Sequence, residues 1–318
     1  MFPAFLENAR VSRLFRLLVA TCLLAGPAAA EPDFRSCEET RLDLAGFISN
    51  KSVDFGSPLV FEDGTCIQRD VTVELRDERL RFTADEVRWQ RQGLRLEAGV
   101  PQSGSLNLQA TGIRTGTLSG NRLVDYHQTL RNENFPSTFS LDLAYDADAQ
   151  RLTVTRAEAL LPGDNSVALT DLAITSGPLN ADTQPMIFLS TLKLENLAVS
   201  VVSHGLFENI ALLPLLTALA GHDLDPEAEL TRALQQAETF LAAVPADAIP
   251  AASRKALESL LADMPTPFGK LMVRIDAPAG FGMANLVPMM RKPGPEALAT
   301  TLGAVDIAIR YTPTRGPQ

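Results

Sequence analysis

The sequence predicts an α+β, β-rich fold: a long, curved, mainly antiparallel sheet with a helical pair inserted near residues 206–265. Three observations support this prediction. Apolar and polar residues alternate through much of residues 37–205, which is typical of strands with one buried face. Two segments with apolar residues at helical spacing follow, and alternation then returns near the C-terminus. We therefore expect the helices to interrupt strands of one sheet.

Residues 1–30 have the pattern of a cleaved signal peptide. Three arginines precede or border the apolar run LLVATCLLAG, and Ala28-Ala29-Ala30 supplies small residues before Glu31. The run is shorter than the roughly 18 apolar residues that a membrane span needs. An uncleaved anchor and a lipoprotein that uses Cys22 are the alternatives. We expect a periplasmic or secreted protein with no transmembrane segment in the mature chain.

Cleavage would leave two cysteines, Cys37 and Cys66. In an oxidising compartment such a pair favours a disulfide, here closing a loop of about 30 residues. Two buried free thiols are the alternative. Zinc is not expected, because neither cysteine has a second Cys or a His at ligand spacing.

The chain is acidic, and the acidic excess grows in the mature form. Loss of one glutamate and three arginines with residues 1–30 changes the net charge from −10 to −12. This charge argues against nucleic acid as a partner, and against direct docking on anionic lipid head groups. The 46% of hydrophobic residues is sufficient for a substantial core.

Residues 31–205 are predicted to form an antiparallel β region. The expected strands contain these alternating residues: Leu42 and Leu44; Val71, Val73 and Leu75; Leu80 and Phe82; Leu94 and Leu96; Leu106 and Leu108; Phe139, Leu141, Leu143 and Tyr145; Leu152 and Val154. Asp146–Gln150 is predicted to be the turn of a hairpin. No helix is expected in this region.

Two similar stretches, VALTDLAI at 167–174 and LKLENLAV at 192–199, predict β-bulges. In each stretch the first two apolar positions and the last two have opposite parity. A strand that keeps its apolar residues on one face must then carry one extra residue between them, as a bulge does. We expect bulges near 170–172 and 195–197.

Residues 206–318 are predicted to hold the helical insertion and the closing strands. The first helix should begin with Asp225 as its N-cap and end at Pro245, and SRKALESLLADMP should form the second. KLMVRID and AVDIAIRYT are expected to be strands, with one or two short helical turns between them.

The sequence contains no motif that predicts catalysis, a metal or a cofactor. HExxH, GxSxG, GxGxxG and the phosphate-binding GxxxxGK[ST] are all missing. Ser203 and His204 are neighbours that should point to opposite faces of a strand, which does not suit a nucleophile and its base. His222, Asp223 and Asp225 are explained by helix capping, and they are also the best candidates for a hydrolase site.

The most distinctive feature is apolar. We interpret Leu206, Phe207, Ile210, Leu213, Leu216 and Leu219 as candidate ligand-binding residues, with Met283, Met289 and Met290 adding flexible side chains. Such residues can hold an acyl chain or a partner helix in a groove. The alternative is that they pack on the sheet and form the core.

The region from LAVSVVSHGLFENI, through FGKLMVRIDAP, to AVDIAIRYTP resembles secreted β-rich proteins of Gram-negative bacteria. Its repeated strand pattern is also loosely similar to the AsmA-like proteins of the envelope. That resemblance covers about residues 140–312 in pattern only, without a shared diagnostic motif. It implies lipid transfer or outer-membrane maintenance through a long apolar-lined sheet.

Together these patterns favour a non-enzymatic periplasmic binding or envelope-assembly protein. Its expected partner is a lipid or an envelope protein with an apolar segment, and no cofactor is expected. The alternative is a periplasmic hydrolase with acid and base chemistry from carboxylates. A third interpretation is a structural adaptor held by protein contacts alone.

Overall fold

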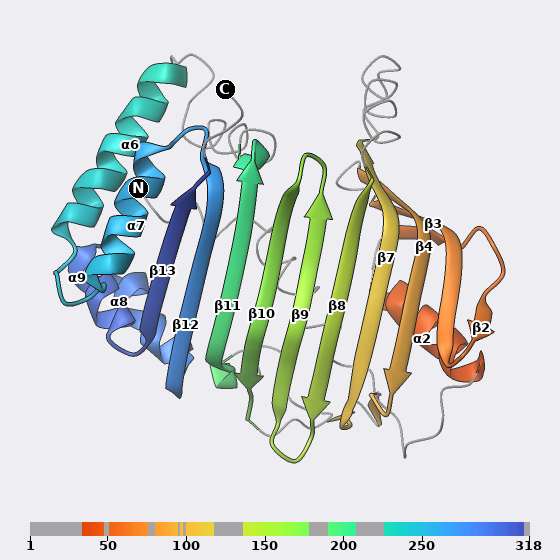
Figure 1. Cartoon of the computed structure of the whole chain (residues 1–318). Coiled ribbons are helices and arrows are strands. Elements are labelled where there is room, and N and C mark those ends of the chain that lie inside the picture. The colour runs from red at the N-terminus through yellow and green to blue at the C-terminus, as the bar shows by residue number, and fades with distance from the viewer. Residues whose placement is uncertain are drawn as a thin grey trace. The chain divides into compact units, whose positions relative to one another are not determined.

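The structure is a computed structural model of the whole chain (Figure 1). It describes residues 34–47, 51–75, 80–94, 96–97, 100–117, 136–177, 190–207 and 226–314. The chain divides into two compact units. Unit 1 comprises Met1–Pro162 and Thr175–Phe188, and unit 2 comprises Gly163–Ile174 and Leu189–Gln318. Each unit is described by itself.

The described residues of unit 1 form one helix followed by strands. Its elements are α2 (Phe34–Phe47), β1 (Lys51–Asp54), β2 (Val60–Glu62), β3 (Thr65–Leu75), β4 (Leu80–Gln92), β5 (Leu96–Glu97), β6 (Val100–Pro101), β7 (Gly104–Thr117), β8 (Ser137–Asp146) and β9 (Arg151–Leu161). The strand order is β1-β3-β4-β7-β8-β9, with β2 also paired to β3, while β5 and β6 pair separately. The pairs from β3 to β9 are antiparallel.

The helix α2 corrects the prediction of a strand at Leu42 and Leu44. Two leucines two residues apart are weak evidence for a strand. The buried residues of this segment are spaced as in a helix. Cys37 and Thr40, three residues apart, are both almost fully buried, whereas Leu42 is 62% exposed. The buried face of this segment therefore follows the helix period, and the β region begins later than predicted.

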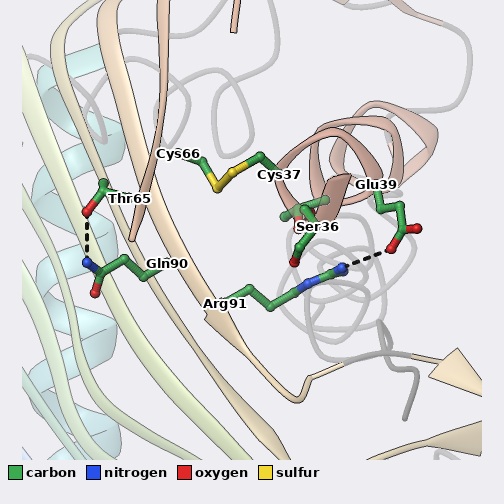
Figure 2. The surroundings of a disulfide bond; sticks show 8 residues. Ser36, Cys37, Glu39, Thr65, Cys66, Gln90 and Arg91 are labelled. Atoms are coloured by element: carbon green, nitrogen blue, oxygen red, sulfur yellow. Dashed lines mark hydrogen bonds and ion pairs between the residues drawn. A yellow bond between two sulfur atoms is a disulfide. The ribbon is translucent and has the colours of Figure 1, made fainter. Parts of the chain in front are cut away.

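The predicted disulfide is confirmed. Cys37 on α2 is bonded to Cys66 on β3, with the two Cα atoms 5.6 Å apart (Figure 2). Beside it, the Arg91 guanidinium of β4 lies 3.6 Å from the Glu39 carboxylate, and Figure 2 shows both side chains near the helix. The link joins α2 to the sheet by a covalent bond as well as by packing.

The two faces of the unit 1 sheet differ in polarity. Trp89, Leu108 and Leu141 occupy paired positions on β4, β7 and β8, and the neighbouring paired positions carry Gln90, Asn107 and Asp142. Alternation thus places one apolar row and one polar row on opposite faces. The most buried apolar side chains of this unit are Cys37, Cys66, Ile67, Trp89, Leu94, Leu106, Leu141, Leu143 and Val154.

The hairpin between β8 and β9 has the predicted turn. The Asp146 carboxylate accepts hydrogen bonds from the backbone N–H of Asp148 at 2.9 Å and of Ala149 at 3.1 Å. An aspartate that bonds the following backbone in this way is a typical turn former. Leu94, in contrast, lies after the end of β4 instead of in a strand.

Unit 2 begins and ends with strands. Its elements are β10 (Asn165–Thr175), β11 (Lys193–His204), α6 (Pro226–Ala243), α7 (Ala251–Ala262), β12 (Phe268–Gly282), α8 (Met283–Arg291), α9 (Pro295–Leu302) and β13 (Asp306–Pro313). The strand order is β10-β11-β12-β13, and the last two pairs are antiparallel. The helical pair α6 and α7 lies between β11 and β12 in the chain, which confirms the predicted β-rich α+β class with a helical insertion.

The helices α6, α7 and α9 share an apolar core. Leu241, Val244 and Ile249 are buried, and they are packed against the partly buried Phe240, Ala248, Leu257, Leu261, Leu298 and Leu302. The apolar residues at helical spacing in the predicted first helix are all buried or half-buried: Leu230, Ala233, Leu234, Ala237, Phe240 and Leu241. The predicted N-cap, Asp225, lies outside the described residues.

Helix α7 lies along the free edge of β13 (Figure 1). The backbone N–H of Ile309 donates a hydrogen bond to the Ser253 hydroxyl at 2.9 Å. Both residues are buried, so the hydroxyl satisfies an edge N–H that water does not reach. The helix thereby protects an edge that would otherwise be open to pairing with another strand.

The structure contains an irregularity at each predicted bulge position. The β11–β12 register shifts between Leu194 and Asn196, where residues 277–280 of β12 lie opposite the single residue Glu195 of β11. The irregularity is therefore at the predicted position, but the extra residues belong to β12 and not to β11. In β10, Asp171 has a φ of +54°, the left-handed conformation found in bulges. Asn196 thus lies at an interruption of the β11–β12 pairing, and Asp171 lies at a left-handed position of the β10 backbone.

Candidate functional site

The structure describes only two of the six candidate ligand-binding residues. Leu206 and Phe207 directly follow β11 and are half-buried. Ile210, Leu213, Leu216 and Leu219 lie outside the described residues, as do His222, Asp223 and Asp225. The grouping predicted for these residues therefore stays a prediction, as does the hydrolase site.

The chain just before Leu206 is held in place by neighbouring strands. The His204 ring stacks on the Phe268 ring, with centroids 4.5 Å apart. The His204 backbone N–H donates to the Asn165 side-chain oxygen at 2.6 Å, and the Asn165 amide is buried. These contacts fix the end of β11 against β10 and β12, and they position the segment that begins at Gly205.

Ser203 and His204 do not form a nucleophile and base pair. The Ser203 side chain is buried, and its hydroxyl has no hydrogen-bond partner among the residues that the structure describes. His204 is instead half-buried and stacked on Phe268. Adjacent residues of a strand point to opposite faces, which keeps the hydroxyl away from the imidazole.

Charged side chains on the strands form ion pairs. Glu86 and Arg88 lie two residues apart on β4, and the Arg88 guanidinium donates a hydrogen bond to the Glu86 carboxylate. This contact holds the pKa of Glu86 below its ordinary value, and Arg69 adds to the effect. Arg274 lowers the pKa of Asp276 on β12 by the same kind of hydrogen bond. Carboxyl groups held ionised in this way are poorly suited to act as general acids at neutral pH.

A shallow concavity lies between α6 and α9. It has a volume of about 520 Å³ and is lined by Arg232, Gln235, Gln236, Thr239, Phe240, Ala243 and Pro295. Arg232 at its rim forms an ion pair with Glu229, whose side chain is largely buried. The cation is thus already neutralised, which weakens the concavity as a site for an anion.

The most distinctive surface feature of unit 2 is an apolar row on α8. Met283, Val287 and Met290 are 45%, 36% and 61% exposed. Their spacing of four and three residues places them on one face of the helix. We call this row the α8 stripe. Two of the methionines singled out from the sequence belong to it, whereas Met289 is half-buried.

Local sequence explains why α8 begins and ends where it does. The Gly282 backbone N–H donates to the Asn285 side-chain oxygen at 2.8 Å, which closes the N-terminal turn. At the other end, the Lys292 N–H bonds the Pro288 carbonyl at 3.1 Å, and Pro293 follows. Because proline has no N–H and restricts the residue before it, the helix stops there.

Basic residues lie at both ends of the α8 stripe. Lys193 is paired with Gly282, the residue before Met283, and Arg291 and Lys292 follow Met290. A Cβ atom at Gly280 would come within 2.9 Å of the Lys193 Cδ atom, so this glycine leaves space for the lysine stem. Within the described residues, none of the three cations has an ion-pair partner within 4 Å.

Sequence reasoning did not identify Val287 or the three basic residues. The available signal was the spacing of Met283, Val287 and Met290 followed by an Arg-Lys pair, a short amphipathic pattern. That pattern alone does not show whether the apolar side faces the core or the solvent. The contribution of Lys193, ninety residues earlier in the chain, depends on the β11–β12 pairing.

None of the helices in the described part of the chain is long and apolar enough to cross a membrane. Within the same residues, no group of three His, Cys, Asp or Glu side chains is arranged to hold a metal ion. No protein-family model and no curated protein matches this sequence.

Proposed function

We propose that this chain is a non-catalytic binding protein of the bacterial cell envelope, exported to the periplasm, which binds an apolar ligand or partner. The observation that carries the proposal is the α8 stripe, because three apolar side chains are exposed on one helix face. Single exposed apolar residues are ordinary, but a contiguous row is typical of a binding surface.

The chemistry of the α8 stripe suits an adaptable apolar contact. Methionine is unbranched and polarisable, so Met283 and Met290 can follow the shape of a lipid chain or an apolar segment. Hydrogen bonding at Gly282 and Asn285 holds the start of the helix, so the row is presented on a defined element. The binding role agrees with the function that the resemblance to AsmA-like envelope proteins implies.

Export is supported by the pattern of residues 1–30 and by the disulfide. The Cys37–Cys66 bond is of a kind that forms and persists in oxidising compartments and is rare in the cytosol. A binding role in the periplasm would bring the α8 stripe close to envelope lipids and to exported proteins.

Photo-crosslinking in intact cells tests the proposal. A benzophenone amino acid would replace Val287 in the full chain, expressed with its own leader in a Gram-negative host. The matched control carries the same group at Lys255, an exposed position of α7. We expect a crosslinked lipid or protein at residue 287 and a much weaker signal at residue 255.

Native mass spectrometry and lipid extraction of the protein purified from the periplasm provide the second measurement. A co-purifying lipid or partner supports the proposal. A clean protein, together with no crosslinked product at residue 287, would overturn it. Equal crosslinking at both positions would also overturn it, because the α8 stripe would then be no better than any exposed surface.

A further inference from the structure

The α8 stripe and its flanking cations together form a small amphipathic surface. An α-helix rises about 1.5 Å per residue, so Met283 and Met290 are separated by about 10 Å along the axis. Lys193 lies at the start of this row, and Arg291 and Lys292 lie at its end. The apolar row is therefore bracketed by positive charge at both ends.

This arrangement matches the boundary between lipid acyl chains and head groups. Apolar side chains on one face of an interfacial helix enter the acyl boundary, and lysine and arginine extend their charged ends to the phosphates. An anionic surface over this row would lie beside Lys193 at one end and beside Arg291 and Lys292 at the other. No ion pair in the described structure needs to be broken first.

A lipid surface fits these residues better than a protein partner does. The core of a protein interface is rich in aromatic residues, methionine and arginine and poor in lysine. The α8 stripe has no aromatic residue, and two of its three flanking cations are lysines. Lysine contributes to lipid binding mainly through its charge, which requires no precise complementary surface.

The overall acidity of the chain does not prevent this local contact. The net charge is −10, but at physiological salt interactions between exposed charges are screened beyond about 8 Å. Lys193, Arg291 and Lys292 adjoin the stripe itself. The nearest acidic residues that follow them in the chain are Glu195, two residues after Lys193, and Glu296, in the first turn of α9.

We propose that α8 docks on an anionic membrane surface, with Met283, Val287 and Met290 at the acyl boundary and the three cations on lipid phosphates. This inference rests on the proposed function and specifies its partner. It also revises the expectation from net charge alone, which argued against docking on anionic head groups.

Vesicle flotation with the mature full-length protein tests the docking. The probes are vesicles of phosphatidylcholine alone and vesicles in which about a third of the lipid is phosphatidylglycerol. We expect binding to the anionic vesicles, little binding to the neutral ones, and release as salt rises. The K292A variant should bind about fivefold more weakly, the effect of one basic residue at an anionic surface.

The K255A variant is the matched control, because Lys255 is an exposed lysine on α7, away from the stripe. It should bind as the unchanged protein does. The triple variant M283S/V287S/M290S should lose most binding while it keeps its circular dichroism spectrum. Equal loss with K292A and K255A would overturn the docking, since only general charge would then matter.

The outcomes separate this inference from the function on which it rests. Absent vesicle binding, with a protein crosslinked at residue 287, would overturn lipid docking and leave the binding function supported. Absent vesicle binding, with no crosslinked product and no co-purified lipid, would overturn both. Binding that is equally strong on neutral vesicles would overturn the role of the cations.

Discussion

The Tyr311 hydroxyl on β13 donates a hydrogen bond to the Asp263 carboxylate, with 2.7 Å between the two oxygens. Asp263 is the residue at the C-terminal end of α7. The contact therefore joins the end of the inserted helix to the edge strand, 48 residues later in the chain. Burial raises the pKa of the Tyr311 phenol, and the neighbouring carboxylate raises it further.

This pair predicts a loss of stability at alkaline pH. Because the folded pKa lies above the unfolded value of about 10, the neutral phenol favours folding below about pH 10, and this contribution is lost as the pH rises through the folded pKa. The Y311F variant should show a shallower fall in the free energy of unfolding between pH 9 and 11, measured in urea. It should also be about 1 kcal/mol less stable at pH 7.

D263N is the informative companion variant. Its amide oxygen can still accept the hydrogen bond, but the charge that raises the phenol pKa is gone. We expect the ultraviolet absorbance of the tyrosinate form to develop at lower pH in D263N than in the unchanged protein. Identical alkaline curves for all three proteins would show that the pair has no effect.

Arg254 is predicted to hold the two inserted helices together. Its guanidinium donates to the Leu241 carbonyl at 2.5 Å, the Val244 carbonyl at 2.9 Å and the Pro245 carbonyl at 3.0 Å. These carbonyls lie at and beyond the C-terminus of α6, where a positive charge is favourable. R254A should lower the free energy of unfolding by about 2 kcal/mol.

Urea unfolding followed by circular dichroism measures this effect. K255A is the matched control, since the neighbouring lysine is exposed and its truncation should change stability by less than about 0.5 kcal/mol. R254K tests the geometry, because an ammonium cannot span three carbonyls as a planar guanidinium does. If R254A matches K255A, the three hydrogen bonds contribute nothing to stability.

Asp171 on β10 has a backbone conformation that most side chains disfavour. Its φ of +54° is tolerated by aspartate, is easy for glycine and is costly for a β-branched residue. D171G should therefore be at least as stable as the unchanged protein, and D171V should lose about 1–2 kcal/mol. Thermal unfolding with T170V as the control, at the preceding strand position, separates this effect from general β-propensity.

The disulfide predicts a stability difference that depends on the redox state. The Cys37–Cys66 link joins residues 29 apart, and closing a loop of this length is worth about 3 kcal/mol in the entropic model. Dithiothreitol should lower the unfolding midpoint of the protein. C37A/C66A should start from a similarly lowered midpoint and show no further response to dithiothreitol. A midpoint that the reductant leaves unchanged would contradict the prediction.

The sequence predicted a large part of the fold, for reasons that particular residues illustrate. Strand alternation identified β8 and β9, because Leu141 and Leu143 repeat on one face, and Asp146 is a residue that turns favour. The parity change around Asn196 identified the position of the irregularity in the β11–β12 pairing, although the extra residues lie on β12. The strand predicted from alternation at Leu42 was wrong. Two alternating leucines were weaker evidence there than the helical spacing of Cys37 and Thr40.

The candidate site was less predictable than the fold. Met283 and Met290 were recognised as flexible apolar residues, but periodicity says only that they share a face and not what covers it. Lys193 was invisible as a member of the site, because a register across ninety residues of chain is needed to bring it to Gly282.

The sequence by itself thus determined the local features of this protein: the alternation of its strands, the helical insertion, the turn at Asp146 and the two cysteines suited to pairing. These features follow from short-range geometry, in which two or three neighbouring residues decide the outcome. Only the tertiary structure decided that α7 covers the β13 edge, that Arg254 caps α6, and that the α8 stripe faces solvent between cations. These three features depend on which surfaces of distant segments come into contact. Whether a side chain is buried is decided by the packed chain and not by the residue pattern along it.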